Sequence, residues 1–277
     1  MKKLLFSLCL LFFFVTVVRA EELNSNVIIS DEGYERLSKF MSDLEISMID
    51  QKTYDLFLDN EVIGYQSYIV EEVYVGSATQ LPRKVSERYM SFDEYANTPS
   101  VAAECSFSSD GTIEYCKTPK KYLRLTVFKN STGVYFDLLN EWLSEPVYKS
   151  FDVLAMRWTN NFSMSYYDGL QRTDGNTTYV NYNTGNGNYK FGTNAIGLSQ
   201  NLVDSATDID NSLTVGGTCS GSGAVWATYQ HAQANITLAT SKLYNFSSSG
   251  YGGVLSFYGA ASGIYDNTTG LSLTFSC

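Results

Sequence analysis

Residues 105–116 read Cys-Ser-Phe-Ser-Ser-Asp-Gly-Thr-Ile-Glu-Tyr-Cys. Their central pair, Asp110-Gly111, is a strong two-residue hairpin turn, because both central positions of a type I′ turn need positive φ and glycine adopts it freely. With this turn, Cys105 lies directly opposite Cys116, at the Cα spacing that a disulfide tolerates. The turn and the cysteines are independent signals of one register, so they predict an antiparallel hairpin closed by a disulfide.

The first 20 residues have the pattern of a secretory signal peptide. Two lysines precede an apolar run from Leu4 to Val18, and residues 18–20 supply a small-residue cleavage site. The apolar run is short for a membrane span, and we expect no transmembrane segment after cleavage. The sequence therefore predicts a secreted protein, located outside the cell, at the cell surface or in the periplasm.

Four cysteines follow the signal peptide, at Cys105, Cys116, Cys219 and Cys277. An even number in an exported chain favours disulfides over metal binding or catalysis. The hairpin register assigns Cys105–Cys116, which leaves Cys219–Cys277 as the second predicted bond. That bond would anchor residue 277 to the fold.

The expected mature chain is strongly acidic. Removal of residues 1–20 leaves 16 basic and 29 acidic residues, a net charge of −13. Such a chain is repelled by nucleic acid, and no basic patch with interleaved aromatic residues is present in the sequence. We therefore expect no nucleic-acid partner.

The composition changes near Trp158. Residues 21–158 hold 23 acidic and 13 basic residues, whereas residues 159–277 hold six Asp, two Lys, one Arg and 16 of the 21 glycines. This shift favours two domains over a single β domain with one highly charged half. We predict a mainly β protein, with an N-terminal amphipathic helix packed on an antiparallel sheet in 21–158. A Gly-, Tyr- and Asn-rich β-sandwich or jelly roll is predicted in 159–277.

The predicted helix rests on an apolar stripe at helical spacing, formed by Leu37, Phe40, Met41, Leu44 and Met48. Residues 53–58 and 62–75 are rich in Tyr, Ile, Val and Phe and are predicted as strands. The acidic pair Glu71-Glu72 is interpreted as part of a solvated strand face. In the second domain, residues 224–232 and 271–276 are predicted as strands and residues 201–212 as a short helix.

Motifs for catalysis or cofactor binding are missing from the sequence. The single histidine, His231, lies on a predicted strand without a Gly-x-Ser-x-Gly nucleophile motif, so a structural role is favoured. One histidine and paired cysteines leave no set of zinc ligands, and no phosphate-binding glycine loop is present. Asp204, Asp208, Asp210 and Asn211 lack the spacing of a calcium loop and are interpreted as a capped, solvated turn. We predict no cofactor and no metal site.

Tyrosine is the most suggestive residue of the second domain, where ten tyrosines lie among Asn, Ser, Thr and Gly. Its flat ring with a polar tip suits adaptable recognition surfaces. Alternatively, these tyrosines fill half-buried strand positions, and this interpretation stays open. We predict the binding residues to be Tyr166, Tyr167, Tyr179, Tyr182 and Tyr189.

The sequence therefore supports the hypothesis of an exported binding protein that recognises a glycan or a surface protein through its second domain. A non-enzymatic role is favoured. Two alternatives stay open: a secreted polysaccharide hydrolase that uses an Asp pair, and a self-assembling or pore-forming β protein.

Overall fold

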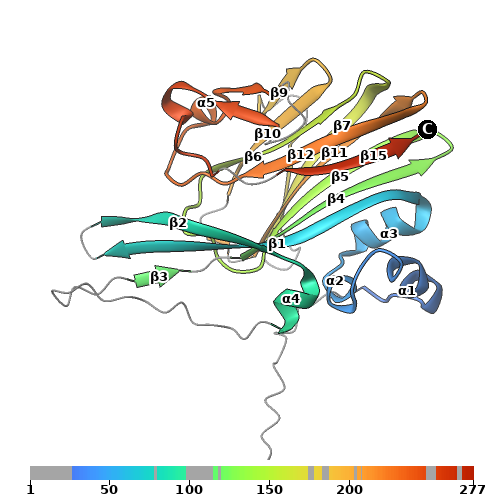
Figure 1. The fold of residues 1–277 in the computed structure, drawn as a ribbon, viewed down its shortest axis with the longest axis horizontal. Coiled ribbons are helices and arrows are strands. Elements are labelled where there is room, and N and C mark those ends of the chain that lie inside the picture. The colour runs from blue at the N-terminus through green and yellow to red at the C-terminus, as the bar shows by residue number, and fades with distance from the viewer. Residues whose placement is uncertain are drawn as a thin grey trace, which may run out of the picture.

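Antiparallel strand pairing organises the chain into two main sheets, as a computed structural model shows (Figure 1). The structure describes residues 27–77, 80–97, 115–117, 120–173, 178–182, 187–202, 205–206, 208–247, 254–266 and 270–277. The larger sheet has the strand order β2-β1-β4-β5-β11-β7-β8, with β3 beside β1. The smaller sheet has the order β15-β12-β6-β10-β9.

The larger sheet consists of β1 (Glu61–Ser77), β2 (Gln80–Met90), β3 (Tyr115–Lys117), β4 (Lys120–Asn130), β5 (Gly133–Trp142), β7 (Phe162–Thr173), β8 (Thr178–Tyr182) and β11 (Ile209–Cys219). The smaller sheet consists of β6 (Phe151–Trp158), β9 (Tyr189–Gly192), β10 (Ala195–Asn201), β12 (Ser222–Gln230) and β15 (Leu271–Ser276). A two-stranded sheet joins β13 (Tyr244–Phe246) to β14 (Leu255–Phe257). The helices are α1 (Asp31–Leu37), α2 (Asp43–Ser47), α3 (Gln51–Asp59), α4 (Phe92–Asn97), α5 (Leu238–Ser241) and the 3₁₀ turn η1 (Gly259–Ala261).

The two sheets enclose one apolar core. Leu123 and Leu125 of β4 meet Leu154 of β6 and Leu198 of β10 there, and none of these four side chains has any exposed surface. Successive side chains alternate between the faces of a strand, so each sheet turns an apolar face to the other. Burial of each such side chain stabilises the fold by about 1.5–3 kcal/mol. The predicted mainly β, sandwich-like fold is confirmed.

The short helices α1–α3 cover the other face of the larger sheet, which we call the outer face (Figure 1). Phe57 of α3 packs edge-on against Phe128 of β4, with ring centroids 5.0 Å apart. Leu37 and Ile46 belong to the same buried cluster. The predicted packing of the N-terminal apolar stripe on an antiparallel sheet is therefore confirmed. Within the described part of the chain, no helix is long and apolar enough to cross a membrane.

The stripe is divided between two helices instead of forming one. Ser42 begins α2 with a capping box, in which its hydroxyl accepts from the Glu45 N–H and the Glu45 carboxylate accepts from the Ser42 N–H. These reciprocal bonds satisfy amides that a helix start leaves unpaired. The chain therefore breaks after α1 and restarts at residue 43.

Residues 53–58, predicted as a strand, form most of α3. Asp50 caps this helix by accepting a hydrogen bond from the Thr53 N–H at 2.8 Å. Tyr54 and Phe57 are both buried on one face of the helix. Capping and this buried helical face outweigh the β-propensity of Thr, Tyr and Phe, which reflects packing more than an intrinsic backbone preference.

Strands from both sides of residue 158 are hydrogen-bonded into both sheets. In the larger sheet β5 pairs with β11, and in the smaller sheet β6 lies between β12 and β10. Residues 209–212, predicted as part of a helix, instead begin β11. The division into domains at residue 158 stays a prediction about independent folding, which separate expression of 159–277 tests.

The predicted Cys219–Cys277 disulfide is present, with Cα atoms 5.7 Å apart. It joins the end of β11 to the residue after β15, and so links the two sheets covalently. The Asp110-Gly111 hairpin and the Cys105–Cys116 bond lie outside the described residues. The backbone of Cys116 in β3 pairs with Val75 of β1.

Candidate functional site

The five predicted tyrosines belong to β7, β8 and β9 at one edge of the sandwich, where β8 and β9 are the outermost strands of their sheets. Tyr182 and Tyr189 are buried, with 6% and 8% of their surface exposed. The Tyr189 hydroxyl donates to the backbone oxygen of Tyr182 at 2.6 Å. Burial raises the pKa of the Tyr182 phenol to about 12. These two side chains fill the core, and the side chain of Tyr179 lies outside the described residues.

Three aromatic rings from the two sheets are in contact at this edge, and we call Tyr167, Tyr189 and Phe191 the aromatic edge. The Tyr167 ring lies 4.9 Å from that of Tyr189 and 5.2 Å from that of Phe191, edge-on in both cases. Phe191 remains 52% exposed, and sequence reasoning missed it because it is a single Phe in a short strand. Tyr166 is 47% exposed and lies in β7 directly before Tyr167, so its side chain points to the other face of the sheet.

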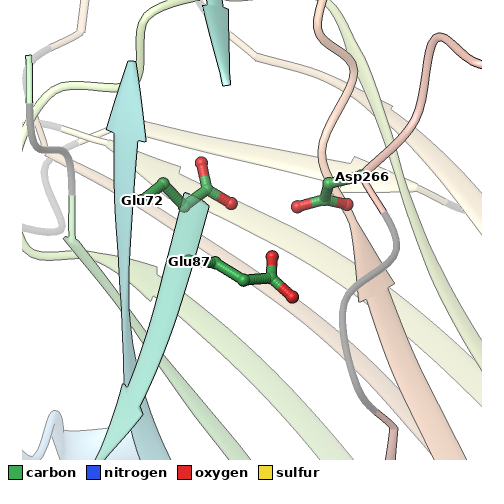
Figure 2. A group of neighbouring side chains, drawn as sticks. All are labelled: Glu72, Glu87 and Asp266. Atoms are coloured by element: carbon green, nitrogen blue, oxygen red, sulfur yellow. The ribbon is translucent and has the colours of Figure 1, made fainter. Parts of the chain in front are cut away.

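A second notable group consists of charged side chains that lie largely inside the structure. The carboxylate–lysine cluster consists of Glu72, Glu87, Asp266, Lys84 and Lys121. Figure 2 shows its three carboxylates turned toward one another, from β1, from β2 and from the segment before β15. Glu72 and Glu87 are direct partners in the β1–β2 register.

Lys121 lies at the centre of the buried part of this cluster. Its Nζ atom donates to Glu72 Oε1 at 2.6 Å and to Asp266 Oδ2 at 2.8 Å. All three side chains have no exposed surface. Lys84 lies nearer the surface, where its Nζ atom is 2.7 Å from Glu87 Oε2 and 3.7 Å from Asp266 Oδ2.

Aromatic side chains enclose the buried lysine. Its Nζ atom lies 5.3 Å from the Trp142 ring centre and 5.2 Å from that of Tyr229. The Tyr74 hydroxyl donates to Glu72 Oε2 at 3.0 Å. Tyr74 and Tyr229 are completely buried. The cluster is therefore shielded from water on its inner side.

The buried charges stabilise one another against the effect of burial. Burial alone would lower the pKa of the Lys121 amine, but the carboxylates of Asp266 and Glu72 raise it above its ordinary value. Burial alone would raise the pKa of Asp266, but Lys121 and Lys84 hold it below its ordinary value. Lys121 and Asp266 thus form a buried ion pair, and the carboxylate of Glu72 is a second negative partner of the same lysine.

The cluster does not fit a metal ion, although three carboxylate oxygens within 4.8 Å of one another resemble a site for a hard cation. The Nζ atoms of Lys84 and Lys121 lie among these carboxylates. Two ammonium groups already supply the positive charge that a cation would bring. We therefore assign the cluster no metal.

His231 adjoins the cluster and has a structural environment. Its Nδ1 atom lies 2.9 Å from Asp152 Oδ2, and its backbone N–H donates to Asp266 Oδ1 at 2.7 Å. Asp152 raises the pKa of His231 against the lowering effect of burial. Among the described residues, no hydrogen-bond partner reaches Nε2 of this ring. A Ser-His-Asp arrangement needs a hydroxyl at that atom, so the described residues do not form a triad.

A pair of carboxyl groups lies on the outer face of the larger sheet. Glu141 of β5 and Asp210 of β11 are direct cross-strand partners. Burial, and then the neighbouring Asp208, raises the pKa of Asp210 to about 7. Burial, and then the neighbouring carboxylates of Asp210 and Asp208, raise the pKa of Glu141 well above its ordinary value. Asp210 is thus a partly buried strand residue and not part of the solvated turn that the sequence suggested.

Sequence reasoning missed the cluster, although a signal was present. Glu71-Glu72 and Lys120-Lys121 are charged pairs on strands, and consecutive side chains of a strand point to opposite faces. One member of each pair must therefore face inward in a sandwich. Glu72 and Lys121 do so, whereas Glu71 and Lys120 form a partly exposed ion pair at 3.1 Å. The interpretation of Glu72 as solvated was wrong.

No family model matches the sequence, and no curated protein matches it. Among solved structures, the chain is similar to the KRT10-binding region domain of the pneumococcal serine rich repeat protein PsrP, with 11% identity and a TM-score of 0.27, over 60% of this chain and 89% of that one. It is also similar to the C-terminal domain of the Streptococcus agalactiae AgI/II polypeptide BspA, with 9% identity and a TM-score of 0.24, over 59% and 79% of the two chains. The C-terminal domain of the Streptococcus pyogenes antigen I/II-family protein AspA matches at 10% identity and a TM-score of 0.24, over 60% and 80%. Likenesses at these TM-scores carry no argument about function.

Proposed function

We propose that the chain is an extracellular binding protein that recognises a carbohydrate through its aromatic edge. The observation that carries this proposal is the contact between Tyr167 and Phe191, whose rings lie 5.2 Å apart while Phe191 remains half exposed. An exposed aromatic ring that its neighbours hold in place is prepared for stacking on the apolar face of a sugar, because little conformational freedom is lost on binding. The predicted signal peptide supports an extracellular location.

The aromatic edge is supported from inside the sandwich. Tyr189 stacks beside Phe191, with ring centroids 6.1 Å apart and an interplanar angle of 23°. The Tyr189 ring is itself fixed by its hydrogen bond to the Tyr182 backbone oxygen. The exposed ring therefore rests on a buried one, which favours a defined orientation toward a ligand.

A glycan array probed with the full mature chain tests this proposal. We expect binding to a restricted set of glycans, reduced by Phe191→Ala and unchanged by Tyr34→Ala. Tyr34 is a matched control because it is an exposed aromatic residue of similar accessibility, 44%, on α1. If no glycan binds, but the wild type binds a protein on a protein array and Phe191→Ala weakens that binding, the ligand is a protein and the carbohydrate proposal is overturned.

The hydrolase alternative has one observation in its favour, the pair Glu141–Asp210. In glycoside hydrolysis, a carboxyl group with a raised pKa acts as the general acid beside a second carboxyl group. Helices α2 and α3 cover this face, however, and Asp50 before α3 forms a 2.5 Å ion pair with Arg172 beside Asp210. Release of reducing sugar from polysaccharides by the wild type, abolished by Asp210→Asn, would establish this function; equal rates would exclude the pair.

A further inference from the structure

We propose that the Nζ atom of Lys121 and the side-chain carboxyl of Asp266 condense to an amide, an isopeptide bond across the sandwich, with Glu72 as the group that moves the protons. This inference is independent of the carbohydrate proposal. It rests on the contacts, the burial and the orientation of these three side chains, which together provide a nucleophile, an acyl group and a proton-transfer group.

The nucleophile and the acyl group are already in contact. Lys121 Nζ lies 2.8 Å from Asp266 Oδ2, and β4 and the segment before β15 hold the two side chains from opposite parts of the chain. Holding two reactants in contact replaces a bimolecular encounter, and well-oriented intramolecular reactions reach effective concentrations on the order of 10⁵ M or more. A lysine amine is an established type of nucleophile in proteins.

Water is kept away from the reacting groups. Lys121, Glu72 and Asp266 have no exposed surface, and Tyr74 and Tyr229 beside them are completely buried. A dry site favours condensation, because the water that forms leaves and hydrolysis has no water to use. Burial carries a desolvation penalty for both charges, although their mutual attraction offsets it, and conversion of the ion pair into a neutral amide removes that penalty.

The two oxygens of Asp266 have different environments, and each suits a different fate. Oδ1 accepts a hydrogen bond from the His231 N–H at 2.7 Å. This donor is placed to stabilise negative charge on Oδ1 when the carbonyl carbon becomes tetrahedral, as an oxyanion-hole amide does. Oδ2 faces the amine and is the oxygen that would leave.

The reaction balances without an oxidant or a co-reactant. The ammonium of Lys121 first gives a proton to Asp266, which yields a neutral amine and a neutral carboxyl group. The nitrogen electron pair then attacks Asp266 Cγ, and the new C–N bond forms as Glu72 accepts a second proton from the nitrogen. Glu72 returns this proton to the hydroxyl at Oδ2, the C–O bond breaks, and one water leaves. The Glu72 carboxylate is regenerated, with Lys84 at 3.8 Å as its remaining cation.

Mass spectrometry of the full mature chain tests the proposal. After export from a bacterial host that adds no glycans, and after reduction of the disulfides, we expect an intact mass lower than the sequence mass by one water. A proteolytic digest should contain one branched peptide with both Lys121 and Asp266. Glu72→Gln should restore the sequence mass, apart from its own substitution, while circular dichroism shows a folded protein.

Glu87→Gln is the matched control, because Glu87 belongs to the same cluster but contacts Lys84 and not Lys121. This variant should keep the loss of one water. Lys121→Arg keeps the positive charge but is a poor nucleophile, and it should abolish the loss even if it lowers stability. Recovery of Lys121 and Asp266 in two separate linear peptides from the folded wild type would overturn the proposal and leave an ion pair only.

Discussion

Lys121 and Asp266 are 145 residues apart in the sequence, yet their side chains are 2.8 Å apart and completely buried. Because Lys121 lies in the larger sheet and Asp266 just before the last strand of the smaller one, this contact joins the two sheets. The Cys219–Cys277 disulfide joins them a second time. The early and late parts of the sequence thus depend on each other for burial of charge.

The buried lysine should be important for stability. Lys121→Met leaves Glu72 and Asp266 as two buried carboxylates without their central cation, and it also removes the amide proposed above. Loss of one partner of a buried ion pair alone typically destabilises a protein by about 3–5 kcal/mol. Urea denaturation near neutral pH measures this loss. Lys120→Met is the control, since Lys120 forms a partly exposed pair with Glu71 that contributes about 1 kcal/mol or less. Equal unfolding free energies for the two variants would contradict the assignment.

Asp210 should make the protein less stable as the pH rises. Burial raises its pKa in the folded protein to about 7, whereas the unfolded chain loses the same proton near pH 4. Between these pH values the folded state therefore binds more protons than the unfolded chain. The contribution of protonated Asp210 to stability is fully present below about pH 4 and is lost as the pH rises through about 7.

The variant Asp210→Asn isolates this effect. Wild type and variant should be similarly stable near pH 4, and the variant should be the more stable near pH 8, by up to about 4 kcal/mol at about 1.4 kcal/mol for each pKa unit. Urea midpoints measured across this pH range check the prediction. Parallel curves for the two proteins would show that Asp210 titrates in the folded state as it does in the unfolded chain.

The Cys219–Cys277 bond should stabilise the fold against unfolding. It closes a segment of 58 residues, for which loop-entropy reasoning gives about 4 kcal/mol, an upper figure if the unfolded chain is compact. The double substitution of both cysteines by serine should lower the thermal midpoint accordingly. A midpoint unchanged from the wild type under non-reducing conditions would mean that the strands hold residue 277 in place without the bond.

Tyr189 and Phe191 should separate stability from binding. Tyr189→Phe removes the hydrogen bond to the Tyr182 backbone oxygen and is expected to destabilise the protein by about 0.5–1.5 kcal/mol. Its ring remains, so ligand binding should change little. Phe191→Ala removes an exposed ring, so it should weaken ligand binding and change the stability little. Denaturation and binding measured on the same two variants distinguish the roles, and identical profiles would argue against them.

The sequence was sufficient for the fold class because alternation and turn residues are local signals. The disulfide at Cys219 could be predicted by elimination, from an even number of cysteines. Helix α3 could not, because Tyr54 and Phe57 have strand propensity and the decisive contacts lie with Phe128 on a distant strand. Local preference is weak where tertiary packing decides.

The site was predicted only in part, for a related reason. Of the predicted tyrosines, Tyr167 and Tyr189 are in ring contact at one edge, but the sequence pattern does not show that Tyr189 is buried and that Phe191 supplies the exposed ring. The contact between Lys121 and Asp266 depends on the order of strands in two sheets, which no local pattern specifies. Paired charges on strands were the only available sign that some of them face inward.

Affinity for a glycan identified on the array tests the carbohydrate proposal most directly. Titration calorimetry of the full mature chain should show Kd raised about ten-fold or more by Phe191→Ala, equivalent to about 1.4 kcal/mol, as expected for the loss of a stacking ring. Tyr34→Ala should leave Kd unchanged. Equal Kd values for wild type and Phe191→Ala, with both proteins folded, would contradict recognition through the aromatic edge.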